Sequence, residues 1–422
     1  MLRPARAAGD VAVISRVNDF RGQGMRIRKL HLPFGALLLG AVAFLGASQR
    51  AGAQTYTAIN LGSLGGRNTI GYAINASGQV AGSGDVAGDY YHAFISDGDS
   101  LTDLGTLAGT VDSNSNGSAI NASGQVAGDS GYPGAPNIAA SHAYISKRGA
   151  LIDLGSLGGA IVSVAAVNDA GEVAGWSYIE PSGQHAFVTH GTKMIDLGTL
   201  GGFNSYADAI NEHGQVVGDA FLPGDQIAHA FITRGTQMID LGTLGGANSV
   251  ALAINSRGQV TGYADTASAL PHAFLAEGGS MTDLGTLGGE TSQGTAINAR
   301  GQVTGYADTA KAGSTHAFIT RGGTMIDLGS LGGTYSAGLA INASGEVVGA
   351  AYTAGNRTQH AFLYSKRKMI DLNEFLSSSD RSTYTLLEAV AINDQGDIVV
   401  NGVDSSTHGK QVFLLRPVSG AP

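Results

Sequence analysis

The chain has 422 residues, of which 65 are Gly and none is Cys, and only 14% are charged. Gly is about twice as frequent as usual and charged residues fall well below the ordinary ~25%, while 43% of the residues are hydrophobic. This composition excludes intrinsic disorder and a collagen helix. The absence of Cys excludes disulfides, thiol catalysis and Cys-ligated metals.

The first segment of the chain is typical of a secretory signal peptide. Basic residues follow Met25, an apolar run occupies 32–47, and Ala51-Gly52-Ala53 is a cleavage motif. The apolar run is shorter than the ~20 residues of a membrane-spanning helix, although an uncleaved membrane anchor is the alternative interpretation. The predicted division of the chain is a non-native upstream extension at 1–24, a signal peptide at 25–53 and one exported domain at 54–422.

The domain that follows is acidic. Residues 1–53 hold eight Lys/Arg and two Asp/Glu, which leaves 16 basic and 31 acidic residues and a net charge of −15. Such a surface argues against nucleic acid or an anionic membrane as the partner. We expect a monomer without a membrane span, located in the periplasm or outside the cell.

Three motifs recur along the domain with a period of 43–51 residues, which is typical of propellers and other repeat arrays. The first is Ala-Ile-Asn-x-x-Gly or a variant, with its Asn at Asn75, Asn121, Asn168, Asn211, Asn255, Asn298, Asn342 and Asn393. The second is His-Ala-Phe/Tyr, starting at His92, His142, His185, His229, His272, His316 and His360. The third is Asp-Leu-Gly/Asn, starting at Asp103, Asp153, Asp196, Asp240, Asp283, Asp327 and Asp371.

Each repeat contains four short apolar or β-branched runs separated by Gly-containing turns, as expected for antiparallel strands. In the fourth repeat the predicted strands are 206–211, 215–220, 229–233 and 237–241. The last repeat lacks its fourth strand, and residues 56–62 near the other end resemble that strand. We therefore predict an all-β, eight-bladed β-propeller of four-stranded blades, closed by the N-terminal strand, which completes the last blade.

The motif set resembles the HAF family of extracellular repeats, named for His-Ala-Phe, over residues 55–416. The resemblance implies export from a bacterial cell and a propeller fold, and it implies little about biochemistry.

The repeated polar residues are predicted to be structural. His and Asp are 11 residues apart in all seven pairs, so with a two-residue turn at Arg234-Gly235 His229 would face Asp240 across two strands. Seven copies cannot form one active site, and we interpret the pairs as fasteners between blades. The Asn of Ala-Ile-Asn is interpreted as a turn residue; the alternative is that Asn oxygens line a channel that binds Ca²⁺.

Residues that break the repeat are the functional candidates, because variable loops on a rigid scaffold carry function. Length varies between the second and third strands and between blades, and both kinds of loop emerge on one face. Residues 112–117 fit the opening of a calcium loop but lack its closing ligands, so Asp112, Asn114 and Asn116 are the metal candidates for a low-affinity Ca²⁺ site. The ligand-binding candidates are aromatic residues at loops, Trp176, Tyr178, Tyr90, Tyr91 and Tyr132.

One repeat also has acidic and His residues beside its Ala-Ile-Asn motif. These residues, Asp208 and His213, are candidates for general acid–base catalysis. The alternative interpretation is that they belong to a solvated turn.

We predict an exported propeller that binds a glycan, small molecule, cell-surface component or protein through its loop-rich face. The alternative is a Ca²⁺-dependent hydrolase acting on a lactone, an ester or a glycan, with the metal in the channel or at Asp112.

Overall fold

The computed structural model of the protein describes residues 55–86, 90–135, 140–180 and 183–418. The predicted extension at 1–24 and signal peptide at 25–53 lie outside these residues. Within the described ranges, no helix is long and apolar enough to cross a membrane.

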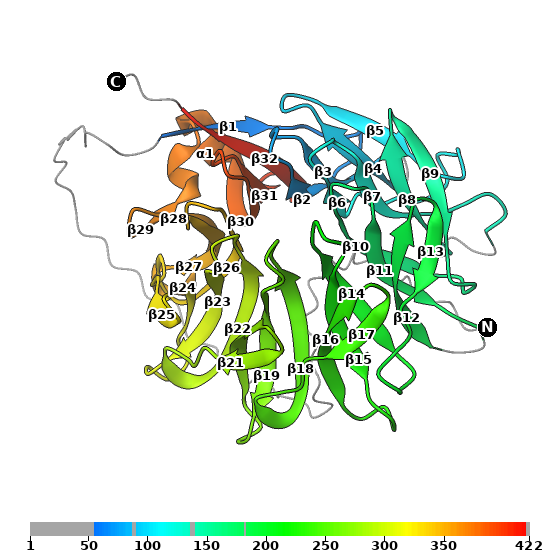
Figure 1. Cartoon of the computed structure of the whole chain (residues 1–422). Coiled ribbons are helices and arrows are strands. Elements are labelled where there is room, and N and C mark those ends of the chain that lie inside the picture. Colours follow the sequence, from blue (N-terminus) through cyan, green and yellow to red (C-terminus); the bar gives the residue numbers. More distant parts are fainter. Residues whose placement is uncertain (1–54, 87–89, 136–139, 181–182, 419–422) are drawn as a thin grey trace, which may run out of the picture. The chain divides into compact units, whose positions relative to one another are not determined.

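The described chain is all-β and propeller-like, and it consists of four-stranded antiparallel units in which consecutive strands pair (Figure 1). Unit 1 contains β2 (Thr69–Ile74), β3 (Val80–Asp85), β4 (Tyr91–Ser96) and β5 (Leu101–Gly105). Unit 2 contains β6 (Ala119–Ile120), β7 (Val126–Ser130), β8 (His142–Lys147) and β9 (Ala150–Gly155). Unit 3 contains β10 (Val162–Val167), β11 (Val173–Tyr178), β12 (Gln184–His190) and β13 (Lys193–Asp196). Unit 4 contains β14 (Ser205–Ile210), β15 (Val216–Phe221), β16 (Ala228–Arg234) and β17 (Gln237–Asp240), which match the predicted strands to within one residue.

The later units follow the same order. Unit 5 contains β18 (Gly245–Ile254), β19 (Val260–Thr266), β20 (Pro271–Glu277) and β21 (Ser280–Asp283). Unit 6 contains β22 (Gly288–Ile297), β23 (Val303–Thr309), β24 (Thr315–Arg321) and β25 (Thr324–Asp327). Unit 7 contains β26 (Gly332–Ile341), β27 (Val347–Thr353), β28 (Gln359–Ser365) and β29 (Lys368–Asp371). A parallel bridge between Thr315 and Tyr335 joins units 6 and 7 into one eight-stranded sheet.

The last unit combines both ends of the domain. It contains β30 (Tyr384–Ile392), β31 (Ile398–Asp404), β32 (Lys410–Pro417) and β1 (Tyr56–Asn60). Strand β1 pairs with β32 in an antiparallel register, so the strand pairing that the sequence predicted between the two ends is present. The helical segments are short. The segment η1 (Ala354–Asn356) lies within unit 7, and η2 (Leu372–Phe375) and α1 (Ser378–Thr383) lie in the connection between unit 7 and the last unit.

The apolar core is divided among the contacts between neighbouring units. The aromatic residue of each His-Ala-Phe/Tyr motif is fully buried, as are the Val residues that open the second strands. One cluster, for example, combines Val188 of unit 3 with Val216 and Phe231 of unit 4. Each sheet therefore buries both of its faces against its neighbours, and the stability of each unit depends on having a neighbour on each side.

The spacing of Asn and Gly is the same in every repeat, and it produces one kind of turn. In the turn after β2, the Gly78 N–H donates to the Asn75 carbonyl at 3.0 Å, and Gly78 has a φ of +77° that favours Gly. The Asn75 side-chain oxygen also accepts from the N–H groups of Ser77 and Gln79 at 3.0 Å. The predicted role of this Asn as a turn residue is therefore confirmed.

The same Asn side chains also connect the units. Each Nδ2 donates to the backbone carbonyl of the corresponding Asn in the next unit, at 3.0–3.3 Å. The series passes from Asn75 through all eight residues, and Asn393 donates back to Asn75. All eight Asn residues are buried, with 1–7% of their surface exposed, so each bond lies where an unpaired amide would be costly.

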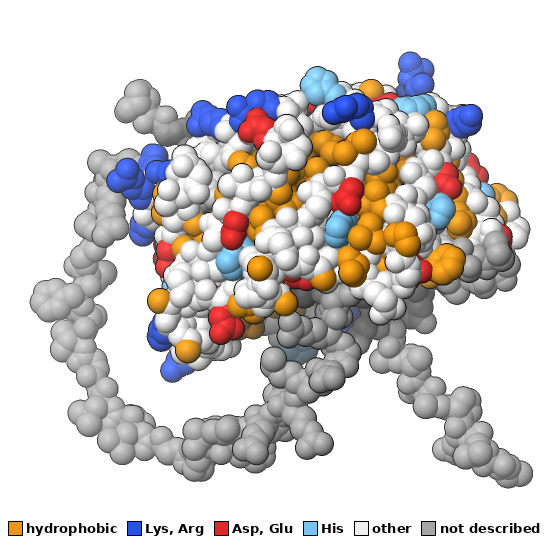
Figure 2. All heavy atoms as spheres, turned by 60° about the horizontal axis from the view of Figure 1, so that its bottom comes forward, with side chains coloured by type: hydrophobic (Ala, Val, Ile, Leu, Met, Phe, Trp, Pro, Cys, Tyr) orange, Lys and Arg blue, Asp and Glu red, His pale blue; other side chains and the backbone are white. Residues whose placement is uncertain are grey.

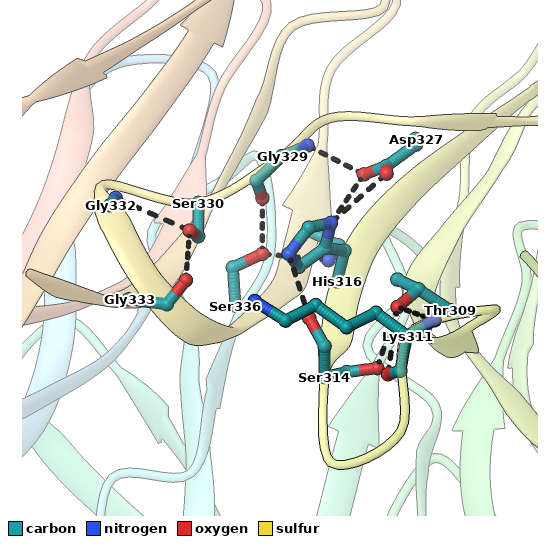
Figure 3. Close-up of polar contacts among 11 residues, drawn as sticks. Thr309, Lys311, Ser314, His316, Asp327, Gly329, Ser330, Gly332, Gly333 and Ser336 are labelled. Atoms are coloured by element: carbon teal, nitrogen blue, oxygen red, sulfur yellow. Dashed lines mark hydrogen bonds and ion pairs between the residues drawn. The ribbon is translucent and has the colours of Figure 1, made fainter. Parts of the chain in front are cut away.

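Ser residues make a second connection between units. The Ser336 hydroxyl in unit 7 accepts from the Ala317 N–H at 2.8 Å and donates to the Gly329 carbonyl, both in unit 6 (Figure 3). The same arrangement recurs at four other junctions, where the Ser residues are Ser115, Ser205, Ser249 and Ser292.

The His–Asp pairs form, but they lie within one sheet and do not connect blades, which corrects the sequence interpretation. Figure 3 shows His316 Nδ1 against both oxygens of Asp327, at 2.9 and 3.0 Å. The predicted register is also wrong, because Asp240 lies opposite Phe231 and the turn residues are Gly235 and Thr236. A shift of two residues keeps each side chain on the same face of the sheet, so His229 still reaches Asp240 diagonally, at 2.9–3.0 Å.

Candidate functional site

The two ends of each sheet differ in what they present. In these meanders the connections between strands one and two and between strands three and four emerge at one end, which we call the turn side. The connections between strands two and three and between successive units emerge at the other end, which we call the loop side. The loop side is the face on which the sequence predicted the binding surface.

An aromatic cluster lies where units 3 and 4 meet. Trp176 on β11 contacts Tyr178 on the same strand, with ring centroids 5.9 Å apart and the planes at 66°. It also contacts Tyr206 on β14 of unit 4, at 5.9 Å and 87°. These are the edge-to-face geometries that aromatic rings prefer. The sequence placed Trp176 and Tyr178 together but missed Tyr206, whose hydroxyl donates to Gln184.

Three apolar side chains on the loop side of units 3 and 4 are exposed. Tyr178 is 38% exposed, Phe203 66% and Ile227 37%. They are three of only five large hydrophobic side chains that are exposed among the described residues, and the other two are Val111 and Val418. Exposed apolar side chains that gather in one place mark interaction sites more often than single scattered ones do.

Hydrogen bonds connect the segments beside these side chains. The Phe203 N–H donates to Asp225 Oδ1 at 2.6 Å, which connects its loop to the one that contains Ile227. The Gln184 N–H donates to Asn204 Oδ1 at 3.0 Å, which connects the start of β12 to the residue after Phe203. We call the set Trp176, Tyr178, Phe203, Tyr206 and Ile227 the apolar patch. The patch therefore comprises residues of β11 and β14 and of two connected loops, on two adjacent sheets.

A second group, at units 1 and 2, is polar and partly buried. Asn116 donates from Nδ2 to Asp129 Oδ2 at 3.2 Å, and its Oδ1 accepts from the Ser83 hydroxyl at 3.1 Å. The Tyr144 hydroxyl donates to the Asn116 carbonyl at 2.7 Å. Burial raises the pKa of Asp129 to about 6, and the hydrogen bond from Asn116 opposes this shift. The sequence did not indicate this shift.

The predicted calcium residues lie beside this polar group. Asp112 is exposed, Asn114 Oδ1 accepts from the Tyr91 N–H at 3.1 Å, and Asn116 is held as described above. Each of the two amide oxygens already accepts a hydrogen bond, Asn114 Oδ1 from Tyr91 and Asn116 Oδ1 from Ser83. No group of three or more His, Asp or Glu side chains among the described residues could hold a metal ion. The calcium site stays a prediction.

The other candidates are placed as follows. Tyr91 begins β4 against Asn114, Tyr90 lies just before it, and Tyr132 stacks on His142 with ring centroids 3.7 Å apart. These three residues belong to units 1 and 2, apart from the two units that carry the apolar patch.

The two catalytic candidates lie in different parts of unit 4. Asp208 lies on β14, and its charge adds to that of Asp219 in raising the pKa of Tyr263, after burial of the phenol, the largest cause. His213 lies in the turn after β14, where its N–H donates to Asn211 Oδ1. Their catalytic role stays a prediction.

Phe203 and Ile227 were not among the sequence candidates, although a signal for Phe203 exists. It follows Leu-Gly-Gly, where the corresponding residue in other repeats is small or polar: Ala160, Ala247, Glu290 and Thr334. A bulky apolar residue at a solvent-facing repeat position breaks the pattern in the way that a binding residue would.

No family model and no curated protein matches the chain. The solved structures that are similar to it in part include the following two. TolB from Acinetobacter baumannii shares 13% identity with a TM-score of 0.38, over 71% of this chain and 65% of that one. A Mycobacterium tuberculosis puromycin-hydrolyzing peptidase shares 11% identity with a TM-score of 0.46, over 82% of this chain and 61% of that one. The chain thus spans less than two thirds of the length of either structure.

Proposed function

We propose that this chain is an exported binding protein that takes a glycan at the apolar patch on its loop side. The observation that carries the proposal is that Tyr178, at the end of β11 beside Trp176, and Phe203 and Ile227, on two hydrogen-bonded loops, are exposed. A sugar ring has an apolar face and polar edges. It suits a surface that offers aromatic rings next to amide groups such as those of Gln184 and Asn204.

The scaffold in this proposal is an eight-bladed propeller closed by β1. Two features support closure: the pairing of β1 with β32, and the hydrogen-bond series that returns from Asn393 to Asn75. A closed ring leaves no open sheet edge between the first and last units, and it would hold the loops of units 3 and 4 in a fixed relation. Export rests on the predicted signal peptide at 25–53 and on the resemblance to the HAF repeats.

Immobilised polysaccharides of bacterial and plant origin, probed with the purified domain, test this proposal. We expect Phe203→Ala and Tyr178→Ala to weaken binding at least tenfold without changing the melting temperature, since both side chains are exposed. Val111→Ala is the matched control, because Val111 is as exposed as Phe203 but lies on another loop.

The outcome that contradicts the proposal is glycan binding that both patch variants retain in full. Binding of a protein but of no glycan, lost in the same two variants, would instead identify the patch as a protein interface.

A further inference from the structure

We propose that the turn side carries a separate binding site for the phosphate group of a phosphomonoester, at a cavity between units 6 and 7. The cavity has a volume of about 370 Å³ and is lined by side chains that include Arg321, Glu346, Ser365, Lys366 and Arg367. Arg321 ends β24, and the other four residues belong to unit 7. The site is independent of the apolar patch, which lies on the loop side.

The turn beside the cavity has an unusual sequence for its conformation. Ser365 pairs with Lys368, so Lys366 and Arg367 form a two-residue turn, and their φ angles are +51° and +65°. Such a turn favours Asn-Gly or Gly-Gly, because most side chains are strained at positive φ.

The corresponding turns of other units do contain Gly. Among the described residues, every other two-residue turn between third and fourth strands has at least one, namely Gly149, Gly191, Gly235, Gly278 with Gly279, and Gly322 with Gly323. Unit 7 thus keeps two long cationic side chains at a conformational cost, and such local strain is concentrated at ligand sites.

The charge of the cavity is opposite to that of the chain. Arg321, Lys366 and Arg367 supply three cations against the one carboxylate of Glu346, whereas the whole chain has a net charge of −9. Glu346 accepts from Asn342 Nδ2 at 2.9 Å and from the Ser365 hydroxyl at 2.7 Å. In the described part of the chain, neither Arg321 nor Arg367 takes part in an ion pair.

The turn side is also where basic residues gather. Several of the third-to-fourth strand turns carry them, at Lys147, Arg148, Lys193, Arg234, Arg321 and Lys368. Figure 2 shows Lys and Arg side chains along one edge of the molecule. Acidic residues also lie on this side, for example Asp97, Asp99 and Glu277 in turns of the same kind, so the excess of positive charge is local to the lining of the cavity.

The chemistry of the lining favours phosphate over a singly charged anion. Guanidinium groups donate paired hydrogen bonds to phosphate oxygens, and two such groups with an ammonium, less the carboxylate of Glu346, give the lining a net charge of about +2, opposite to the charge of about −2 on a phosphomonoester at neutral pH. The Ser365 hydroxyl, which now donates to Glu346, gives the site a neutral polar group at its wall. The volume leaves room for a phosphate with a small organic group attached.

Inorganic phosphate is the probe for the test, with the purified domain at low ionic strength. We expect phosphate to raise the melting temperature saturably, and acetate or chloride at the same ionic strength to do so much less. The double variant Arg321→Gln/Arg367→Gln should bind phosphate at least tenfold more weakly by calorimetry. Lys147→Gln/Arg148→Gln, at the equivalent turn of unit 2, is the matched control and should bind like the wild type.

A second variant separates binding from stability. Lys366→Asn/Arg367→Gly gives the turn the sequence that its conformation prefers, so without phosphate the variant should melt higher than the wild type. Phosphate should no longer shift its melting temperature. The proposal is overturned if phosphate stabilises this variant as much as the wild type, or if acetate acts as strongly as phosphate.

Discussion

The side-chain amide of Asn393 donates to the backbone carbonyl of Asn75 at 3.1 Å, although 318 positions separate the two residues. This bond completes a series that links each of the eight Ala-Ile-Asn turns to the next. The series follows from the position of each Asn at the end of a first strand, where its Oδ1 holds its own turn and its Nδ2 is directed to the neighbouring unit.

Replacing Asn393 by Ala should destabilise the domain. The variant loses the bond to Asn75 and leaves a buried carbonyl and turn N–H groups without this partner, so the free energy of unfolding should fall by about 1–3 kcal/mol. Urea unfolding followed by circular dichroism measures the change. An unchanged unfolding midpoint and slope would show that the turns do not depend on the amide.

Removing the N-terminal strand should have a larger effect. Residues 54–62 include β1 and two buried apolar residues, Tyr56 and Leu61. Without them β32 becomes an exposed edge that can pair with other molecules. We expect the truncated domain to melt at a lower temperature, over a broader range, and to aggregate. A transition as sharp and as high as that of the intact domain would contradict closure by β1.

Ser249 and His229 offer a matched comparison at one junction. Ser249 is buried and makes two hydrogen bonds from unit 5 to unit 4, so Ser249→Ala should cost about 1–3 kcal/mol. The carboxylate partner of His229, on Asp240, is 41% exposed. His229→Ala should therefore cost less than about 1 kcal/mol, as exposed ion pairs do. Chemical denaturation of both variants checks the order, and the reverse order would mean that the His–Asp pair within a sheet contributes more to stability than the Ser bonds between units.

Asp129 should give the domain a pH-dependent stability. Its pKa is about 6 in the folded protein, while an unfolded Asp titrates near ~3.9, so the folded state binds the proton more tightly. This contribution is fully present below about pH 4 and is lost as the pH rises through about 6, by about 1–3 kcal/mol in total.

Asp129→Asn is the variant that tests this, because its amide cannot ionise. Its stability should change less between pH 4 and pH 7 than that of the wild type, in urea unfolding at several pH values. Asp112→Asn, at an exposed position, is the control and should keep the wild-type slope. Equal slopes in the wild type and Asp129→Asn would show that another group sets the dependence.

The strands could be predicted well from the sequence because the same pattern of four strands and their turns recurs in every repeat. Four strands per repeat, the Asn-to-Gly turn and the pairing of residues 56–60 with the last unit all depend on contacts within one repeat or on the missing strand of the last one. The His229–Asp240 register was wrong because a two-residue turn can begin at Arg234 or at Gly235, and both place His and Asp on one face.

Contacts between repeats could not be read in the same way. The bonds from Asn75 to Asn121 and from Ser249 to Ala230 join residues whose spacing within one repeat carries no information about the neighbouring sheet. The apolar patch was predicted in part, through Trp176 and Tyr178. Phe203 was missed although it is bulky and apolar where other repeats have a small or polar residue. Ile227 was missed because nothing in its loop sequence indicates which side chain faces solvent.

The most direct test of the proposed function uses the emission of Trp176, which is the only Trp in the chain. Its ring contacts Tyr178 and Tyr206 inside the apolar patch, so tryptophan fluorescence reports on the patch alone. Titration with a glycan that the domain retains should change the emission saturably, with the same Kd as in the binding assay, and Phe203→Ala should shift that curve to at least tenfold higher concentrations. A glycan that binds with full affinity while the emission of Trp176 stays constant would place the binding site elsewhere on the molecule.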